Sequence, residues 1–196
     1  MYCKFARSFV LRALLPAIVL CAGCSLSPAQ EVIHAITGVA TKVDSAARTI
    51  TLTSSDGTET VMQNDAKNHP RYDFDKLLQS SATDSSAFDK QGDRVIVYYF
   101  GEGLLRRAVA VTDLGQTPLK VSTGTVAHWD RHHHIITVKA ADGTKQAFQL
   151  DNKTAVDTPM GVVNGDKCDP QNGDQVSVKY LSKDGSNEAV FLSEAL

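Results

Sequence analysis

Cysteine is scarce in this 196-residue chain, and its four copies are unevenly placed. Cys3, Cys21 and Cys24 all fall within the first 24 residues, which leaves Cys168 as the sole thiol of the remainder. A single thiol cannot form an intrachain disulfide. Cys168 is therefore either a buried side chain or available for an intermolecular bond.

A bilayer-spanning hydrophobic stretch is also missing from the start of the chain. Residues 13–22 are apolar, but they fall short of the about 20 residues that a transmembrane helix needs. Lys4, Arg7 and Arg12 give this stretch a basic front. A basic front followed by a short apolar segment favours a secretory signal peptide, which we expect over residues 1–23.

The segment Leu20-Cys21-Ala22-Gly23-Cys24 resembles the lipobox of bacterial lipoproteins, with Cys21 where that family usually has Leu. The resemblance implies that Cys24 is acylated and becomes the mature N-terminus, so that residues 24–35 form a lipidated tether. Ser25 resembles the class sorted to the outer membrane, which implies a lipid anchor on the periplasmic face in a Gram-negative bacterium. The alternative is an ordinary cleaved signal peptide and a soluble periplasmic protein.

Excess positive charge is lacking after the signal region. The first 23 residues hold three of the 20 basic residues and no acidic one, so the remainder carries 17 basic and 22 acidic residues, a net charge of −5. A nucleic-acid-binding face needs the opposite sign. We therefore expect no nucleic-acid partner.

An internal repeat organises the rest of the chain. Residues 37–67 align with residues 123–153 without a gap, and 11 of the 31 positions are identical. Residues 92–109 align in the same way with residues 173–190. Because repeats of this kind define the architecture, we predict two units, repeat 1 (residues 36–114) and repeat 2 (residues 121–196).

Each repeat shows the pattern of five short strands and no long amphipathic helix. Glycine-containing pairs, Asp56-Gly57 and Asp142-Gly143, are typical of hairpin turns between the second and third strands. The expected strands cover residues 36–43, 49–53, 58–63, 93–100 and 107–113 in repeat 1, and residues 121–129, 135–139, 144–150, 174–181 and 188–193 in repeat 2. Longer connections, residues 64–91 and 151–172, follow the third strands, with a short helix expected over residues 74–79.

Five strands with an insertion after the third resemble the OB-fold, a small Greek-key barrel. The pattern Gly-Asp-x-Val-x-Val-x-Tyr, at residues 92–99 and 173–180, is similar to that of small periplasmic OB-like families, which include the copper chaperone of the Cus efflux system. The expected fold class is therefore all-β, with two tandem five-stranded OB-like small barrels after a cleaved signal peptide.

A histidine cluster is the best candidate for chemistry. His128, His132 and His134 lie in and before the expected loop between the first two strands of repeat 2, and imidazoles bind Zn and Cu well. The alternative is an exposed polar hairpin tip. The Cus-type chaperone holds copper through a His, two Met and a Trp, and the surroundings of Trp129 lack such a methionine pair.

Catalytic signatures are missing: the sequence has no Gly-x-Ser-x-Gly elbow, no His-Glu-x-x-His helix and no phosphate-binding glycine loop. We therefore expect no enzyme and no catalytic residues. The expected function is a periplasmic binding or scaffolding module, with an envelope protein or a small ligand as partner and without a cofactor; the alternative is a periplasmic metal-binding protein. Candidate ligand or partner residues are Trp129, His133, Tyr98, Arg106 and Arg107.

Overall fold

The computed structural model describes residues 31–55, 57–63 and 74–194, and Glu31–Leu196 form one compact unit. The expected signal peptide, Cys24 and most of the expected tether lie outside the described residues. Within the described ranges, no helix has both the length and the hydrophobicity to cross a membrane.

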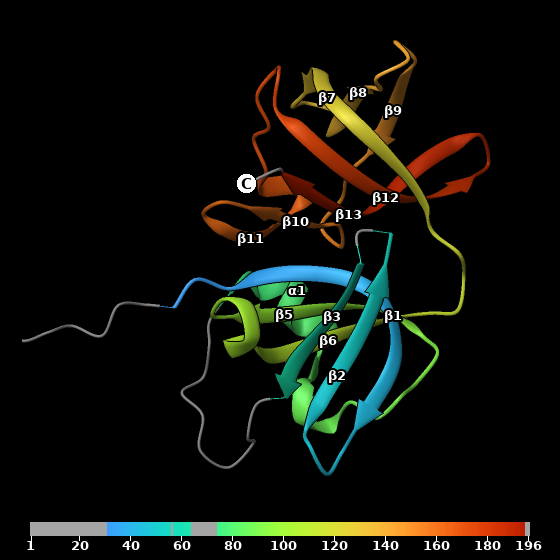
Figure 1. Ribbon diagram of the computed structural model, residues 1–196. Helices are drawn as coiled ribbons and strands as arrows, with labels where there is room; N and C mark the ends of the chain where they lie inside the picture. Colours follow the sequence, from blue (N-terminus) through green and yellow to red (C-terminus); the bar gives the residue numbers. More distant parts are fainter. Residues whose placement is uncertain (1–30, 56, 64–73, 195–196) are drawn as a thin grey trace, which may run out of the picture. The chain divides into compact units, whose positions relative to one another are not determined.

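The first half of the unit, barrel 1, is a sheet in the strand order β3-β2-β1-β5-β6-β4 (Figure 1). A parallel pairing of β3 with β6 closes five of these strands into a barrel, and β4 is added at the edge of β6. The strands are β1 (His34–Asp44), β2 (Thr49–Ser54), β3 (Gly57–Gln63), β4 (Thr83–Asp84), β5 (Arg94–Phe100) and β6 (Arg107–Gly115). Short helices connect them: α1 (Lys76–Ser81), η1 (Ser85–Ala87) and η2 (Gly103–Leu105).

The second half, barrel 2, repeats this ring of strands. Its sheet has the order β11-β10-β13-β12-β7-β8-β9, and one pair, Glu188 with Gln149, closes the ring between β13 and β9. The elements are β7 (Lys120–Asp130), β8 (Ile135–Lys139), β9 (Lys145–Gln149), β10 (Ala155–Thr158), β11 (Gly161–Asn164), η3 (Gly165–Lys167), β12 (Gln175–Lys183) and β13 (Ser186–Glu194). The all-β fold class with OB-like barrels is thereby confirmed.

A glycine marks the point where the first strand of each barrel changes partner. The first half of β1 pairs with β5 and its second half with β2, and Gly38 lies at the exchange. A Cβ atom at Gly38 would lie 2.9 Å from the carbonyl oxygen of Thr53. Gly124 holds the same place in β7, and a Cβ there would lie 2.2 Å from the carbonyl oxygen of Lys139. The repeated glycine therefore allows two strands to approach closely.

The repeated aspartates serve turns. Asp44 Oδ1 accepts hydrogen bonds from the backbone N–H groups of Ala46 and Ala47, and Asp130 Oδ1 does the same for His132 and His133. Each turn ends on a residue with positive φ, 54° at Arg48 and 51° at His134. Aspartate therefore recurs at this position of both repeats because both have the same kind of turn there.

The structure differs from the sequence prediction mainly in the two long connections. The connection in barrel 2 contains the β10–β11 hairpin, in which β10 also pairs in parallel with β13. Helix α1 spans Lys76–Ser81, two residues later than expected. The hairpin was missed because Pro159 and Gly161 punctuate two strands of only four residues each.

Three groups of buried side chains hold the unit together. One fills barrel 1 around Ile50 and Val97, and another fills barrel 2 around Ile136 and Phe148. The third contains Tyr98 of barrel 1 and Phe191 of barrel 2, so it joins the two barrels. Strand β5 is consequently buried on both faces, with Val95 and Val97 toward one group and Ile96 and Tyr98 toward the other.

Candidate binding cleft between the barrels

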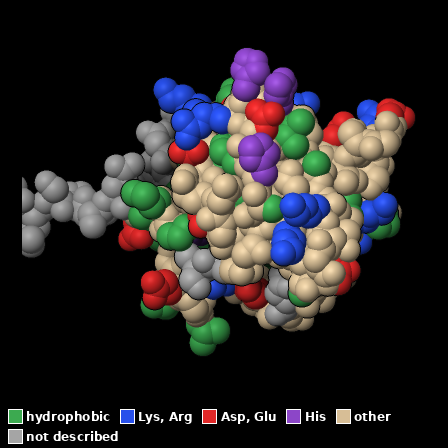
Figure 2. Space-filling model, turned by 90° about the horizontal axis from the view of Figure 1, so that it is seen from above, with side chains coloured by type: hydrophobic (Ala, Val, Ile, Leu, Met, Phe, Trp, Pro, Cys, Tyr) green, Lys and Arg blue, Asp and Glu red, His purple; other side chains and the backbone are tan. Residues whose placement is uncertain are grey.

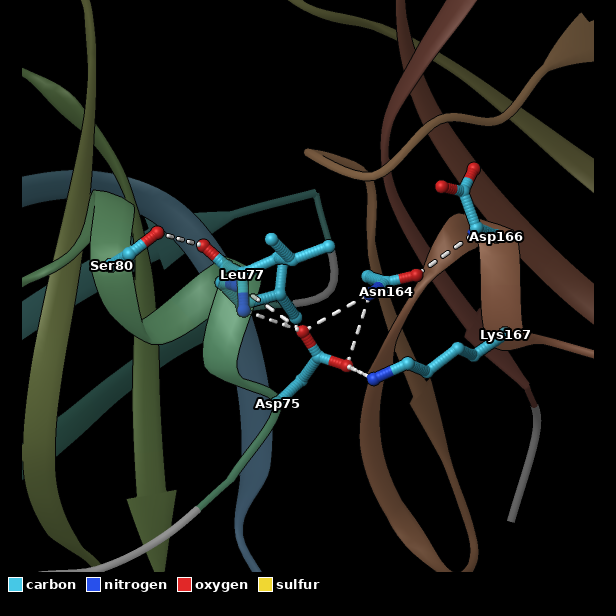
Figure 3. Close-up of polar contacts among 7 residues, drawn as sticks. Asp75, Leu77, Ser80, Asn164, Asp166 and Lys167 are labelled. Atoms are coloured by element: carbon cyan, nitrogen blue, oxygen red, sulfur yellow. Dashed lines mark hydrogen bonds and ion pairs between the residues drawn. The ribbon is translucent and has the colours of Figure 1, made fainter.

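Asp75 forms the main polar contact between α1 and barrel 2 (Figure 3). Its carboxylate accepts hydrogen bonds from the backbone N–H groups of Leu77 and Leu78 and thereby caps α1. The same carboxylate accepts from Asn164 Nδ2 at 3.1 and 3.0 Å and from Lys167 Nζ at 2.8 Å. Burial opposes the charge, but the hydrogen bonds from Lys167, Asn164 and the helix prevail and lower the pKa of Asp75.

The start of β1 makes a second set of contacts with barrel 2. Asp157 Oδ1 lies 3.1 Å from His34 Nδ1 and accepts a hydrogen bond from the backbone N–H of Ala35 at 3.0 Å. Further along β1, Lys179 Nζ donates to the carbonyl oxygen of Thr37 at 3.2 Å. Strand β1 is thus held by polar groups of barrel 2 along its first half.

A cleft of about 230 Å³ opens beside these contacts. Thr37, Glu59 and Tyr99 line it from barrel 1, and Asp157, Lys179 and Glu194 line it from barrel 2. A second hollow of about 270 Å³ shares Thr37, Ser54 and Lys179 with it. Concave sites with a few convergent polar groups are the usual form of small-ligand sites.

The environment of the cleft shifts the pKa of two of its acidic groups, Asp157 and Glu194. Burial raises the pKa of Asp157, although the Ala35 N–H and the neighbouring His34 partly offset it. Burial also raises the pKa of Glu194, and Asp174 and Asp157 add to the effect by repulsion. Two carboxyl groups that ionise reluctantly in one concavity indicate a site where added positive charge would be favoured.

The histidine cluster does not converge. His128 is exposed on β7, and His132 and His133 are exposed on the turn that follows. His133 Nδ1 lies 2.8 Å from Asp130 Oδ2. Histidine side chains stand at the surface in Figure 2, and no group of three metal-ligating side chains comes together among the described residues. The structure therefore does not assemble His128, His132 and His134 into a metal centre.

Trp129 and His134 belong to the end of barrel 2. Trp129 is partly buried against the core of that barrel, and its ring meets that of His134 edge-on at 6.2 Å between centroids. Trp129 therefore covers a barrel end.

The remaining candidate residues from the sequence lie in different environments and do not form one site. Tyr98 is only 1% exposed and stacks on Phe74 at 4.7 Å, so it is a core residue within β5 and the expectation that it contacts a partner is corrected. Arg106 forms an ion pair with Glu59 and lies 4.9 Å above the ring of Tyr99, at the edge of the cleft. Arg107 is exposed at the start of β6.

The two cysteine expectations have different outcomes. Cys24 lies outside the described residues. Cys168 is 6% exposed, and burial, with the nearby charges of Glu194 and Asp169, raises its pKa to about 12. Of the two alternatives for this thiol, the structure shows the buried one.

Sequence reasoning missed the cleft residues Asp157, Lys179 and Glu194. Each belongs to a strand or hairpin of barrel 2 and becomes part of a site only where β1 approaches. One signal was present: Val95-Ile96-Val97-Tyr98-Tyr99 is a continuous apolar run, typical of a strand covered on both faces. That run indicated that another part of the chain packs on barrel 1.

Comparison with known proteins adds little to this geometry. No protein-family model and no curated protein matches the chain. Among solved structures, the crystal structure of Ag(I)CusF is similar to 40% of this chain over 100% of its own length, at 14% sequence identity and a TM-score of 0.32. At that score, the similarity does not bear on the function of this chain.

Proposed function

We propose that this chain is a lipid-anchored, non-catalytic binding protein of the bacterial envelope, held through Cys24 on the periplasmic face of the outer membrane. Its cleft between the barrels takes a small ligand, or a segment of an envelope protein, that carries a cationic amine. The observation that carries the proposal is that three acidic residues, Glu59, Asp157 and Glu194, line one cleft against a single basic residue, Lys179.

The chemistry of the cleft supports a cationic ligand. Ionisation of Asp157 and Glu194 is disfavoured by burial, and a bound cation would offset that penalty. The volume of about 230 Å³ is below the about 300–1,000 Å³ of clefts that hold drug-sized molecules. An amine of few atoms, or one basic side chain of a partner, matches that size.

The polar surroundings support binding rather than catalysis. Asp157 already accepts a hydrogen bond from the Ala35 backbone and lies beside His34, so it acts as a fixed acceptor. Lys179 Nζ donates to the Thr37 carbonyl and lies 5.8 Å from the Phe191 ring centroid. Asp157 can therefore accept a hydrogen bond from an amine, while the Lys179 ammonium is engaged with the Thr37 carbonyl.

The test follows the unfolding temperature of the acyl-free chain, starting at Ser25, with a panel of small amines, short basic peptides and their uncharged analogues. An amine at 100 times its dissociation constant should add about 2.7 kcal/mol of stability. We expect this gain to shrink in Glu194→Gln and to persist in Glu188→Gln, which changes an exposed glutamate on the same strand.

Two outcomes would contradict the proposal. Equal stabilisation by the uncharged analogues would remove the role of the carboxylates. A hydrolase or transferase activity that a single substitution abolishes would make the protein an enzyme. The anchor is tested separately by palmitate incorporation that depends on Cys24.

A further inference from the structure

Two turns of the structure carry large hydrophobic side chains that contribute nothing to a core. Leu104 and Leu105, in η2 between β5 and β6, are 91% and 74% exposed. Met160, in the turn between β10 and β11, is 91% exposed. Side chains exposed to this degree mark an interaction surface when they gather in one place.

The two turns flank the start of β1. His34 pairs with Tyr99 near the end of β5, so the first residues of β1 lie beside the strand that leads into η2. On the other side, Val162 N–H donates to the Ile33 carbonyl at 2.7 Å, and a Cβ at Gly161 would lie 2.9 Å from Val32 Cγ1. Figure 1 shows η2 and the β10–β11 turn on the side where β1 begins, and Figure 2 shows hydrophobic side chains along that edge.

The chain length before β1 limits how far a membrane anchor could lie from this edge. Six residues lie between Cys24 and Glu31, and the seven Cα–Cα steps between the two span at most about 25 Å when fully extended. An acyl chain on Cys24 therefore brings a lipid surface within that distance of Glu31. The first described residues, which lead into β1, lie between the two turns that carry the exposed hydrophobic side chains.

We propose that Leu104, Leu105 and Met160 form a membrane-contact surface that enters the boundary between lipid headgroups and acyl chains. The inference rests on the proposed anchor at Cys24, and it names the lipid bilayer as the occupant of this surface. Apolar side chains on protruding turns bind such a boundary through the area that they bury. The exposed charges beside them, Glu102 and Arg107, are of opposite sign, so hydrophobic burial supplies the attraction.

The test uses the full acylated chain in phospholipid vesicles of phosphatidylethanolamine with a minority of phosphatidylglycerol. An environment-sensitive fluorophore is attached to Leu104→Cys, and in a second variant to Lys145→Cys at the start of β9. Cys168 is buried and does not compete for the label. We expect a blue-shifted emission, quenched by lipid-borne nitroxides, at position 104 and a water-like emission at position 145.

Two results would overturn the proposal. One is a water-like emission at position 104 in protein that remains bound to the vesicles. The other is a blue shift that needs no vesicles and grows with protein concentration, because it would assign the surface to a second copy of the chain.

A companion measurement separates this surface from the anchor. In the acyl-free chain that starts at Ser25, the double change Leu104→Ser/Leu105→Ser should lower the vesicle partition coefficient by roughly a hundredfold, from the lost burial of two leucines. Leu77→Ser, at a 48% exposed leucine of α1, should leave it unchanged. Equal losses in both variants would overturn the proposal. Failure of palmitate incorporation in the wild-type chain would instead refute the anchor alone.

Discussion

The Asp75 carboxylate and the Asn164 side-chain amide join the two barrels across 89 residues of sequence, with Nδ2 at 3.1 and 3.0 Å from the two carboxylate oxygens. Both side chains are almost completely buried, Asp75 at 3% exposure and Asn164 at 0%. The same carboxylate caps α1, so one side chain links a helix of barrel 1 to a hairpin of barrel 2.

Replacement of Asp75 by Ala should therefore destabilise the protein by about 2–4 kcal/mol. The estimate combines about 1 kcal/mol for the lost helix cap with about 1–3 kcal/mol for the unpaired Asn164 amide. Urea denaturation measures the change. Asp84→Ala is the matched control, because Asp84 caps η1 from an exposed position and should cost less.

The effect of Asp75 should depend on pH. Its pKa is lower in the folded state than the about 3.9 of an unperturbed aspartate. Its stabilisation is therefore fully present above that value and is lost as the pH falls through the folded pKa. If the difference in the free energy of unfolding between wild type and Asp75→Ala stayed constant down to pH 2, it would contradict this assignment.

Glu194→Gln should stabilise the ligand-free protein at neutral pH. The pKa of Glu194 is raised in the folded state, so the unfolded chain ionises first as the pH increases, and the native state loses stability from about pH 4 upward until the pH passes the folded pKa. The glutamine variant removes that loss. Thermal unfolding from pH 3 to 8 should show the two proteins converging at the acidic end.

Gly124→Ala should cost about 3 kcal/mol, because a Cβ atom 2.2 Å from the Lys139 oxygen forces β7 away from β8. The equivalent change in barrel 1, Gly38→Ala, should cost less, since the corresponding distance is 2.9 Å. Ser122→Ala, on the same strand as Gly124, serves as the control. Equal stability of all three variants would mean that the strand crossing is looser than the structure shows.

Titration with Zn²⁺ or Cu²⁺ should produce no stabilisation that depends on the turn histidines. His132 and His133 are exposed, and the described residues bring no three metal-ligating groups together. The measurement compares the unfolding temperature of wild type and a His132→Ala/His133→Ala/His134→Ala variant. A rise that occurs in wild type and is absent from the variant would restore the metal-binding hypothesis.

The barrels could be predicted from the sequence because their signals are local. Alternating apolar residues such as Val176 and Val178 identify strands, the pair Asp142-Gly143 identifies a turn, and the internal repeat sets the order. Five strands in each unit follow from those patterns.

The cleft could not be predicted, because its residues are brought together by the packing of one barrel on the other. Asp157 meets His34 across 123 residues, and Lys179 reaches Thr37 across 142. Neither contact has a periodic or spacing signal. Lys179 is buried in the structure. In an isolated strand, its place between Val178 and Tyr180 would put it on the solvent-facing side.

The hydrogen bond from Val162 to Ile33 has a consequence for the order of folding. A ribosome makes the chain from its N-terminus, so β1 emerges long before the hairpin that secures its first residues. Barrel 1 can close its own ring early, with the start of β1 paired with β5, but the contacts of β1 with barrel 2 form only after β10 and β11 have been made. The two barrels are therefore expected to dock after barrel 1 has closed, and a truncation before residue 162 would remove the N–H group that binds the Ile33 carbonyl.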